Sequence, residues 1–346
     1  KVSALMVNIP HRLKEAKHQP NYEFRTLPPN PHELPPDLEI PTIVIEGEEV
    51  FKNFTARFTL EVPEEILDPV PLGIVHGWFG TQSSYVPLRN WCARNGKPSF
   101  TVEPSRKLER FAGYNPQHLL HPEKLLSQTV WGAMKGIQKM RHIEKRGVDT
   151  SINDLMGHSM GGRTGVETAL RKPKHVRTMS FNAAAGMEPH SVKDFLLYRI
   201  PSFLTRELFP ALKNGQLKAY TNPAAAEEFV EYVMAGGLRA VKEGLSIGNC
   251  SIRDKAAQLG ELGIKTAIYG YRADAMIPIQ ESLEHSGHLV DLSAIFPYPE
   301  VGHLAPQIYP EVVGKAQLEI IDALTGTNKA ARHKHLARTA MMSEAA

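Results

Sequence analysis

The chain has 346 residues, 42% of them hydrophobic, which is enough for one large α/β domain or two smaller ones. Its 40 Lys and Arg against 37 Asp and Glu give a formal net charge of +3, which argues against a dedicated nucleic-acid-binding protein. Two cysteines exclude a disulfide framework, and no apolar run is long enough for a transmembrane segment.

Residues 1–40 are predicted to form an N-terminal arm. Prolines crowd its second half, and such a stretch favours extended polyproline structure and cannot join the interior of a sheet. The first residue is Lys1 rather than methionine, so the compartment stays open. The two cysteines favour the cytoplasm, and removal of a leader would allow secretion.

Runs rich in β-branched residues predict strands, two of them directly after the arm. From residue 70 strands alternate with helices, as in a mostly parallel sheet. One expected strand carries Asn153 and Asp154 near its start, which is more polar than a buried central strand usually is. The expected strands are 41–47, 55–62, 70–77, 97–104, 152–157, 175–182, 264–270 and 291–297.

Apolar residues at helical spacing predict three helices, over 121–145, 160–171 and 311–324. Between residues 185 and 262 the alternation stops and the pattern is helical throughout. We interpret this segment as a helical cap inserted into an α/β core formed by 41–184 and 263–326. The alternative is a set of peripheral helices that pack on the sheet. The cap would carry two apolar stripes, one of Phe195, Leu196, Leu197, Ile200, Phe203, Leu204, Leu208 and Phe209, the other of Phe229, Val230, Val233, Met234, Leu238 and Val241.

Residues 327–346 form a basic C-terminal tail that includes Lys329, Arg332, Lys334 and Arg338. We expect a solvated terminus here, and the alternative is a peptide that docks on an acidic partner. A protein partner or a second copy of the chain could bind through either the arm or the tail.

The motif GHSMG (157–161) falls between an expected strand and an expected helix. A serine hydroxyl needs an aligned base and a stabilised oxyanion to act as a nucleophile. In a small-x-Ser-x-small turn, Ser159 would occupy a strained position that requires small neighbours, here Gly157 and Gly161. The alternative is a glycine-rich turn without chemistry.

The stretch HGWFG (76–80) ends the first strand of the alternating series. A turn there can direct a backbone N–H toward the same site, so we expect the N–H groups of Trp78 and Met160 to form an oxyanion hole. The residues His76, Gly77 and His158 would support this site. The alternative is a tight turn in which Trp78 serves only packing.

The candidate base is His303, which lies between the last strand and the last helix, where the loop returns to the edge that carries Ser159. A carboxylate must orient this imidazole, and Asp274 in YGYRADAMIP follows the strand that ends at Gly270. Asp291 and Glu188 are the weaker candidates for that role. The chain order is then serine, aspartate, histidine.

The motifs HGWFG, GHSMGG, GYRADAMIP and VGHLAP, in this order, resemble those of the α/β-hydrolase superfamily, and the early segments are similar to those of bacterial lipases and carboxylesterases. The resemblance covers roughly residues 40–325. It implies an α/β-hydrolase fold with an eight-stranded, mostly parallel sheet and a cap over the site. It also implies hydrolysis through an acyl-enzyme, without a metal or an organic cofactor.

The sequence therefore predicts a serine hydrolase that cleaves a small-molecule carboxylic ester with a hydrophobic acyl or alcohol part. Two alternatives stay open. The same triad could cleave a thioester, amide or carbon–carbon bond, or the chain could be a non-catalytic binding or structural protein on a hydrolase scaffold.

Overall fold

The computed structural model describes most of the predicted α/β core. The described residues are 42–51, 54–78, 80–102, 122–188, 190–217, 244–248, 250–296 and 301–326. The predicted arm, the basic tail and the second apolar stripe of the cap, residues 229–241, lie outside this description.

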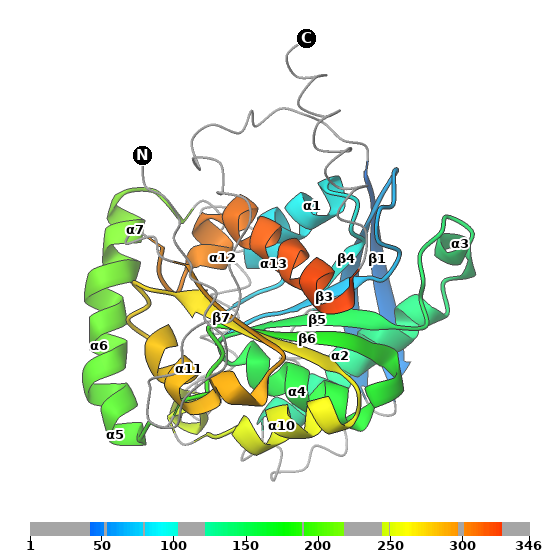
Figure 1. Cartoon of the computed structure of the whole chain (residues 1–346). Coiled ribbons are helices and arrows are strands. Elements are labelled where there is room, and N and C mark those ends of the chain that lie inside the picture. The colour runs from blue at the N-terminus through cyan, green and yellow to red at the C-terminus, as the bar shows by residue number, and fades with distance from the viewer. Residues whose placement is uncertain are drawn as a thin grey trace.

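An eight-stranded sheet forms the centre of the molecule (Figure 1). Its order is β1-β2-β4-β3-β5-β6-β7-β8, with antiparallel pairs β1–β2 and β2–β4 and parallel pairs beyond them. The predicted mostly parallel, eight-stranded sheet is therefore confirmed. The strands are β1 (Thr42–Phe51), β2 (Phe54–Pro63), β3 (Leu72–Val75), β4 (Ser99–Val102), β5 (Asn153–His158), β6 (Val176–Asn182), β7 (Lys265–Tyr271) and β8 (Leu292–Phe296).

Helices cover both faces of the sheet (Figure 1). On one face α1, α12 and α13 pack together, and on the other α4 packs against α2 and α10. Although α10 lies in the range predicted for the cap, it packs against α4 and β7 of the core. These helices are α1 (Val86–Arg94), α2 (Pro122–Gln138), α4 (Gly161–Arg171), α10 (Arg253–Glu261), α12 (Ala305–Ile308) and α13 (Pro310–Thr325).

The helix predicted over 121–145 is interrupted. Helix α2 ends at Gln138 and a short α3 (Arg141–Glu144) follows, because Met140 has ψ 74° and leaves the helical region. The Met140 side chain packs against the apolar core at this bend. Three short 3₁₀ turns, Ser83–Tyr85, Pro173–His175 and Gly287–Leu289, and helix α11 (Ile279–Ser286) complete the connections.

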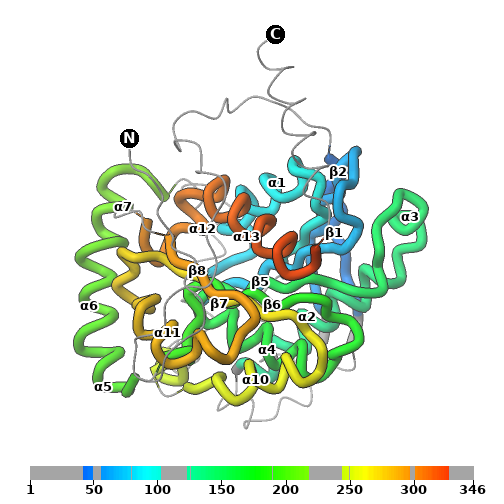
Figure 2. The backbone as a smooth tube through the Cα atoms, viewed as in Figure 1, coloured from blue at the N-terminus to red at the C-terminus, as the bar shows by residue number. Residues whose placement is uncertain are grey.

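Residues 192–213 form one long helix on the side of the molecule opposite β1 and β2 (Figure 2). It consists of α5 (Val192–Asp194), α6 (Ile200–Phe203) and α7 (Phe209–Lys213), joined by the π-helical segments 195–199 and 204–208. Arg199 fixes this helix to α11 by donating to Glu281 Oε2 at 2.8 Å.

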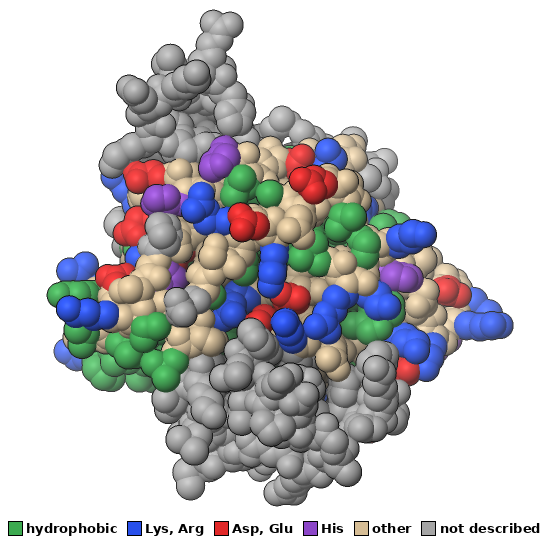
Figure 3. Space-filling model, turned by 90° about the horizontal axis from the view of Figure 1, so that it is seen from below, with side chains coloured by type: hydrophobic (Ala, Val, Ile, Leu, Met, Phe, Trp, Pro, Cys, Tyr) green, Lys and Arg blue, Asp and Glu red, His purple; other side chains and the backbone are tan. Residues whose placement is uncertain are grey.

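The outer side of this helix exposes hydrophobic side chains, including Leu197 and Tyr198, which are 57% and 65% exposed. Figure 3 shows such side chains gathered at the edge where α5 to α7 lie, together with some Lys and Arg side chains. The helix is therefore apolar on more than the face that it turns toward the core.

A buried ionic cluster lies where the central strands begin. Lys97 Nζ is 2.6 Å from carboxylate oxygens of both Asp68 and Asp154, and Arg177 Nη2 contacts the same two residues at 2.7 and 2.6 Å. Burial opposes the charged form of Asp68, but the two cations overcome it and lower the pKa of Asp68 to about 2. The polar start of β5 is thus explained by the cations that surround Asp154.

Three further findings concern the described residues alone. None of their helices combines the length and the hydropathy needed to cross a membrane. No group of three or more His, Cys, Asp or Glu side chains among them is arranged to hold a metal ion. Cys92 and Cys250 are both buried free thiols.

Candidate active site

Ser159 occupies a sharp turn between β5 and α4. Its φ is 54°, in the left-handed region that side chains other than glycine rarely adopt. The Ser159 N–H donates to the Asn182 carbonyl at 3.1 Å, and its own carbonyl accepts from Gly162 and Ala185 at 3.0 and 3.1 Å. Such strain costs about 1–3 kcal/mol and persists only where the surrounding structure enforces it.

The glycines around this turn are required by space. A Cβ on Gly157 would lie 2.6 Å from the Gly161 carbonyl oxygen, and one on Gly161 would lie 2.1 Å from the Val75 carbonyl oxygen. A Cβ on Gly77 would lie 2.8 Å from Ser159 Cβ. The turn after β3 and the turn after β5 therefore touch each other through their glycines.

His303 and Asp274 meet beside this turn. His303 Nδ1 lies 2.8 Å from Asp274 Oδ2, and the other carboxylate oxygen accepts from the N–H groups of Met276 and Ile277 at 2.8 and 2.7 Å. Both residues are buried. Burial alone would lower the pKa of His303, but the charge and hydrogen bond of Asp274 raise it above its ordinary value.

The two weaker carboxylate candidates lie elsewhere. Asp291 precedes β8, at the opposite end of the sheet, where it accepts from the Thr266 N–H at 2.8 Å. Glu188 is buried beside the start of the 192–213 helix and accepts from Ser282 Oγ at 3.0 Å. Of the three carboxylates, Asp274 is the one that pairs with His303.

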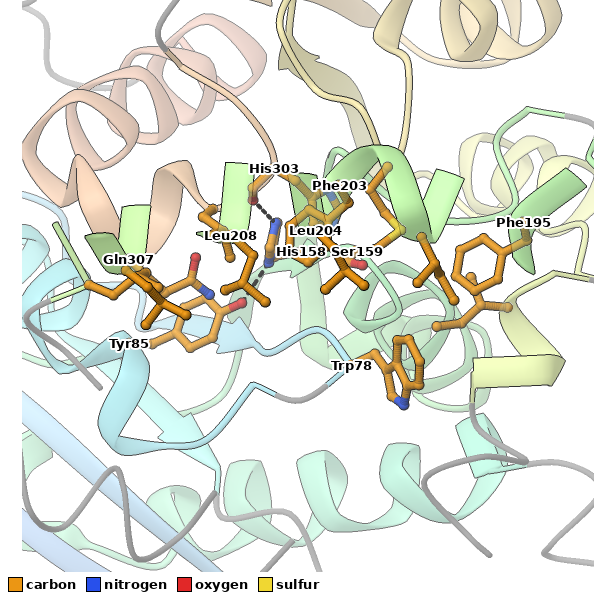
Figure 4. Close-up of a pocket in the computed structure, with 16 residues that line it drawn as sticks. Trp78, Tyr85, His158, Ser159, Phe195, Phe203, Leu204, Leu208, His303 and Gln307 are labelled. Atoms are coloured by element: carbon orange, nitrogen blue, oxygen red, sulfur yellow. Dashed lines mark hydrogen bonds between the residues drawn. The ribbon is translucent and has the colours of Figure 1, made fainter. Parts of the chain in front are cut away.

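Ser159 and His303 line one cavity of about 540 Å³ (Figure 4). The Ser159 hydroxyl and His303 Nε2 are not hydrogen-bonded to each other in the described part of the chain. Catalytic hydrogen bonds often tighten only when substrate binds, so the shared cavity is compatible with transfer of a proton between them.

His158, next to Ser159, holds the main chain of His303. Its Nε2 lies 2.9 Å from the His303 carbonyl oxygen, and its Nδ1 lies 2.5 Å from Tyr85 Oη (dashed lines in Figure 4). Burial lowers the pKa of His158 well below its ordinary value, so the ring is neutral. In the tautomer that satisfies both contacts, Nε2–H donates to His303 and Nδ1 accepts from Tyr85.

One backbone donor, the Met160 N–H, follows the serine directly. The Met160 N–H, at the start of α4, donates no hydrogen bond to a described residue. Trp78 follows β3 and lines the same cavity, with its ring 6.3 Å from that of Phe195. His76 lies one residue before the close contact of Gly77 with Ser159, and its Nδ1 is 3.0 Å from the Gly77 carbonyl oxygen.

The long helix 192–213 supplies much of the cavity wall. Trp78, Ile247, Met276 and Leu304 add apolar surface from the core. No lining residue among those described is Lys, Arg, Asp or Glu. The helix contributes Phe195, Ile200, Phe203, Leu204, Leu208 and Leu212.

Glu207, also on this helix, binds the two loops that carry Asp274 and His303. It accepts from the Ala275 N–H at 2.7 Å and from the His303 N–H. A Cβ on Gly302 would lie 2.2 Å from its carboxylate, so a larger residue there would displace the end of the Glu207 side chain. Burial, and then the negative charge of Asp274, raise the pKa of Glu207 to about 7.

Three residues near the site were not predicted from the sequence: Tyr85, Glu207 and Gln307, of which Tyr85 and Gln307 line the cavity. One signal was present for Glu207, since it is the only acidic residue between Phe195 and Phe209. A lone carboxylate in an apolar helix needs a partner. No comparable signal marks Tyr85 or Gln307.

No family model matches the sequence, and no curated protein matches it. Solved structures do match. A 2-hydroxy-6-oxo-6-phenylhexa-2,4-dienoate hydrolase from Rhodococcus sp. strain RHA1 is similar with a TM-score of 0.55 and 14% identity, over 81% of this chain and 99% of that one. A thermophilic esterase from Thermogutta terrifontis is similar with a TM-score of 0.51 and 15% identity, over 82% of this chain and 99% of that one.

A bromoperoxidase from Bacillus anthracis is similar with a TM-score of 0.51 and 12% identity, over 80% of this chain and 100% of that one. Proteins with such different names share the arrangement of strands and helices, so the similarity concerns architecture rather than substrate. Together with the strand order and the turn at Ser159, these matches show that the chain has the α/β-hydrolase fold.

Proposed function

We propose that this protein is a serine hydrolase that cleaves a carboxylic ester with a hydrophobic acyl or alcohol part. The observation that carries the proposal is the strained turn at Ser159, which lines the same cavity as a His303 paired with Asp274. Strain of this kind at a cavity wall is typical of a nucleophile and has no evident structural use here.

In the proposed first step, His303 Nε2 takes the proton from Ser159 Oγ, which attacks the carbonyl carbon of the ester. The negative charge moves to the carbonyl oxygen, where the N–H groups of Met160 and Trp78 stabilise it. Losing one such donor typically costs about 2.7–4 kcal/mol. Asp274 holds the imidazole in the required tautomer and stabilises its charged form.

In the second step the bond to the alcohol breaks, and the His303 proton goes to the leaving oxygen. Ser159 then carries the acyl group. Water, deprotonated by His303, attacks this acyl-enzyme and releases the acid, and Ser159 regains its proton. The original serine proton thus leaves with the alcohol and is replaced by a proton from water, so each cycle consumes one water and regenerates the chain.

The hydrophobic part of the proposed substrate follows from the apolar cavity wall supplied by residues 195–212. An acyl chain buried there would gain about 0.8 kcal/mol for each CH₂ group. Part of the cap predicted over 185–262 supports this proposal, because the helix over residues 192–213 lines the cavity.

A panel of p-nitrophenyl esters of rising acyl length tests this function, with the matched thioester and anilide of the best acyl group as further arms. We expect turnover to rise from acetate to a medium-length acyl group, and Ser159→Ala to abolish it. Faster turnover of the thioester or anilide would assign the triad to that bond instead. No turnover of any arm by the native chain would contradict the proposed hydrolase.

A further inference from the structure

Gln307 stands out among the cavity-lining residues. The polar groups of Tyr85 and His158 bond to each other, and Ser159 and His303 are the proposed nucleophile and base. The remaining wall is made almost entirely of aliphatic and aromatic side chains. The Gln307 amide is thus a polar group in an apolar wall, outside the proposed catalytic set.

The oxygen of this amide is buried and unsatisfied. Gln307 is 6% exposed, and its amide oxygen has no hydrogen-bond partner among the described residues. Its backbone is fixed, because the Gln307 N–H donates to the Leu304 carbonyl at 3.0 Å in α12. Figure 4 shows the side chain pointing toward the other lining residues, beside Tyr85.

A buried amide without a partner costs about 1–3 kcal/mol, and apolar residues of similar size would fill the same volume without this cost. Gln307 lies four residues after His303, so the amide and the proposed base belong to one segment. A ligand in the cavity that reached His303 would therefore lie within the volume that Gln307 borders.

We propose that Gln307 is a specificity-determining residue that binds an uncharged polar group of the substrate, away from the bond that is cleaved. This inference rests on the proposed function and narrows its substrate class to esters whose hydrophobic part carries one ketone, hydroxyl, ether or amide group. The glutamine amide offers both a donor and an acceptor, so it can pair with any of these groups.

A charged group fits this position less well. No Lys or Arg is among the described residues that line the cavity. A carboxylate moved from water to this wall would lose its hydration without gaining a counter-charge, which is far more costly than burying a ketone. The cavity therefore selects neutral substrates that are mainly hydrophobic and carry a single hydrogen-bonding group.

The test compares p-nitrophenyl octanoate with its 4-, 5-, 6- and 7-oxo derivatives, which scan the position of one ketone along the same chain. The quantity measured is the ratio of kcat/KM for each oxo ester to that for plain octanoate. We expect the native enzyme to prefer at least one oxo ester. In Gln307→Met, which keeps the length of the side chain without its amide, this ratio should fall by about tenfold.

Leu304→Met is the matched control, since it changes a neighbouring wall residue without removing a polar group, and it should keep the native ratio. Labelling with a fluorophosphonate probe shows whether Ser159 is reactive in each variant. If the probe does not label Gln307→Met, the kcat/KM ratios of the native enzyme and of Leu304→Met alone decide whether an oxo ester is preferred.

Normal labelling with no preferred oxo ester, or with an equal preference in Gln307→Met, would overturn the role of Gln307 and leave the proposed function intact. It would indicate that water satisfies the amide. Absence of labelling in the native chain would overturn the proposed function and the role of Gln307 together.

Discussion

Charged side chains are buried at both ends of the central strands, but the balance of positive and negative charge differs between the two ends. At the end where the strands begin, Lys97, Arg177, Asp68 and Asp154 neutralise one another, with each cation contacting both carboxylates. At the opposite end, Asp274 and Glu207 flank the single imidazole of His303.

Uncharged groups lie beside the charges at both ends. Beside the charges of the second end, the Met160 N–H and the Gln307 amide oxygen have no partner among the described residues. At the first end the four charged side chains are paired with one another, and the neighbouring Asn153 Oδ1 is the buried atom without a partner among the described residues. The second end retains open hydrogen-bonding groups and a strained serine, which are the properties expected of a site that binds and reacts.

The largest expected effect is that of Asp274→Asn on activity. The Asn side-chain oxygen can still accept from Met276 and Ile277, but its NH₂ group then faces His303 Nδ1. The imidazole is forced into the tautomer that cannot accept the serine proton, so we expect kcat to fall by roughly 10⁴-fold with the fold intact.

The control for this variant is Glu188→Gln, which alters another buried carboxylate that the sequence offered as a candidate acid. Its kcat should stay within about tenfold of the native value, since Glu188 is not hydrogen-bonded to His303. The reverse order of the two effects on kcat would show that the acid has been misassigned.

The next effect concerns stability at the other end. Lys97→Met leaves Asp68 and Asp154 with one cation instead of two, and we expect a loss of about 3–5 kcal/mol in the free energy of unfolding, measured with urea. The exposed pair Arg57–Glu48 is the comparison, and Glu48→Gln should change stability by about 0–1 kcal/mol. Equal losses in the two variants would mean that burial of the cluster is irrelevant.

The same cluster predicts that the free energy of unfolding decreases at low pH. The pKa of Asp68 falls from 3.8 to about 2 on folding, so the unfolded chain binds the extra proton first as the pH drops. This contribution, about 2 kcal/mol, is complete above pH 4 and disappears between about pH 4 and 2. Urea unfolding of the native chain and Asp68→Asn over this range measures it, and parallel curves would disprove it.

The smallest effect is expected from Glu207→Gln. This change removes a negative charge that raises the pKa of His303, so the acid limb of the kcat/KM profile should move to lower pH. One of the two backbone N–H groups also loses its acceptor, and kcat should fall several-fold. A drop in kcat without any shift of the limb would reduce Glu207 to a structural contact.

The pH dependence of the free energy of unfolding of Glu207→Gln is a second measurement. Folding raises the pKa of Glu207 from 4.5 to about 7, so its contribution is complete below pH 4.5 and declines as the pH rises to about 7. The variant should lack this decline when unfolding is followed across the same pH range.

The sequence was informative wherever local pattern determines structure. Alternating apolar runs located all eight strands, and the glycines around Ser159 indicated a turn whose φ of 54° the structure shows. Loops that follow parallel strands share an edge, so the meeting of Asp274 with His303 could be predicted without coordinates.

Contacts that depend on how a helix is rotated, or on irregular turns within it, could not be predicted from the sequence. Glu207, which accepts from the His303 N–H, lies in a π-helical segment of the long helix, and no spacing rule anticipates such a segment. Gln307 turns into the cavity from a four-residue helix, too short to show a period. The break at Met140 likewise occurs without a proline or glycine at that residue, and its side chain packs against the core.

The central claim, that Ser159 is a nucleophile activated by His303 and Asp274, is tested most directly by fluorophosphonate labelling followed by mass spectrometry of the modified peptide. We expect a single adduct on Ser159 that is lost in Ser159→Ala and forms roughly 10⁴-fold more slowly in Asp274→Asn. No adduct on the folded native chain, or an adduct that persists in Ser159→Ala, would contradict it.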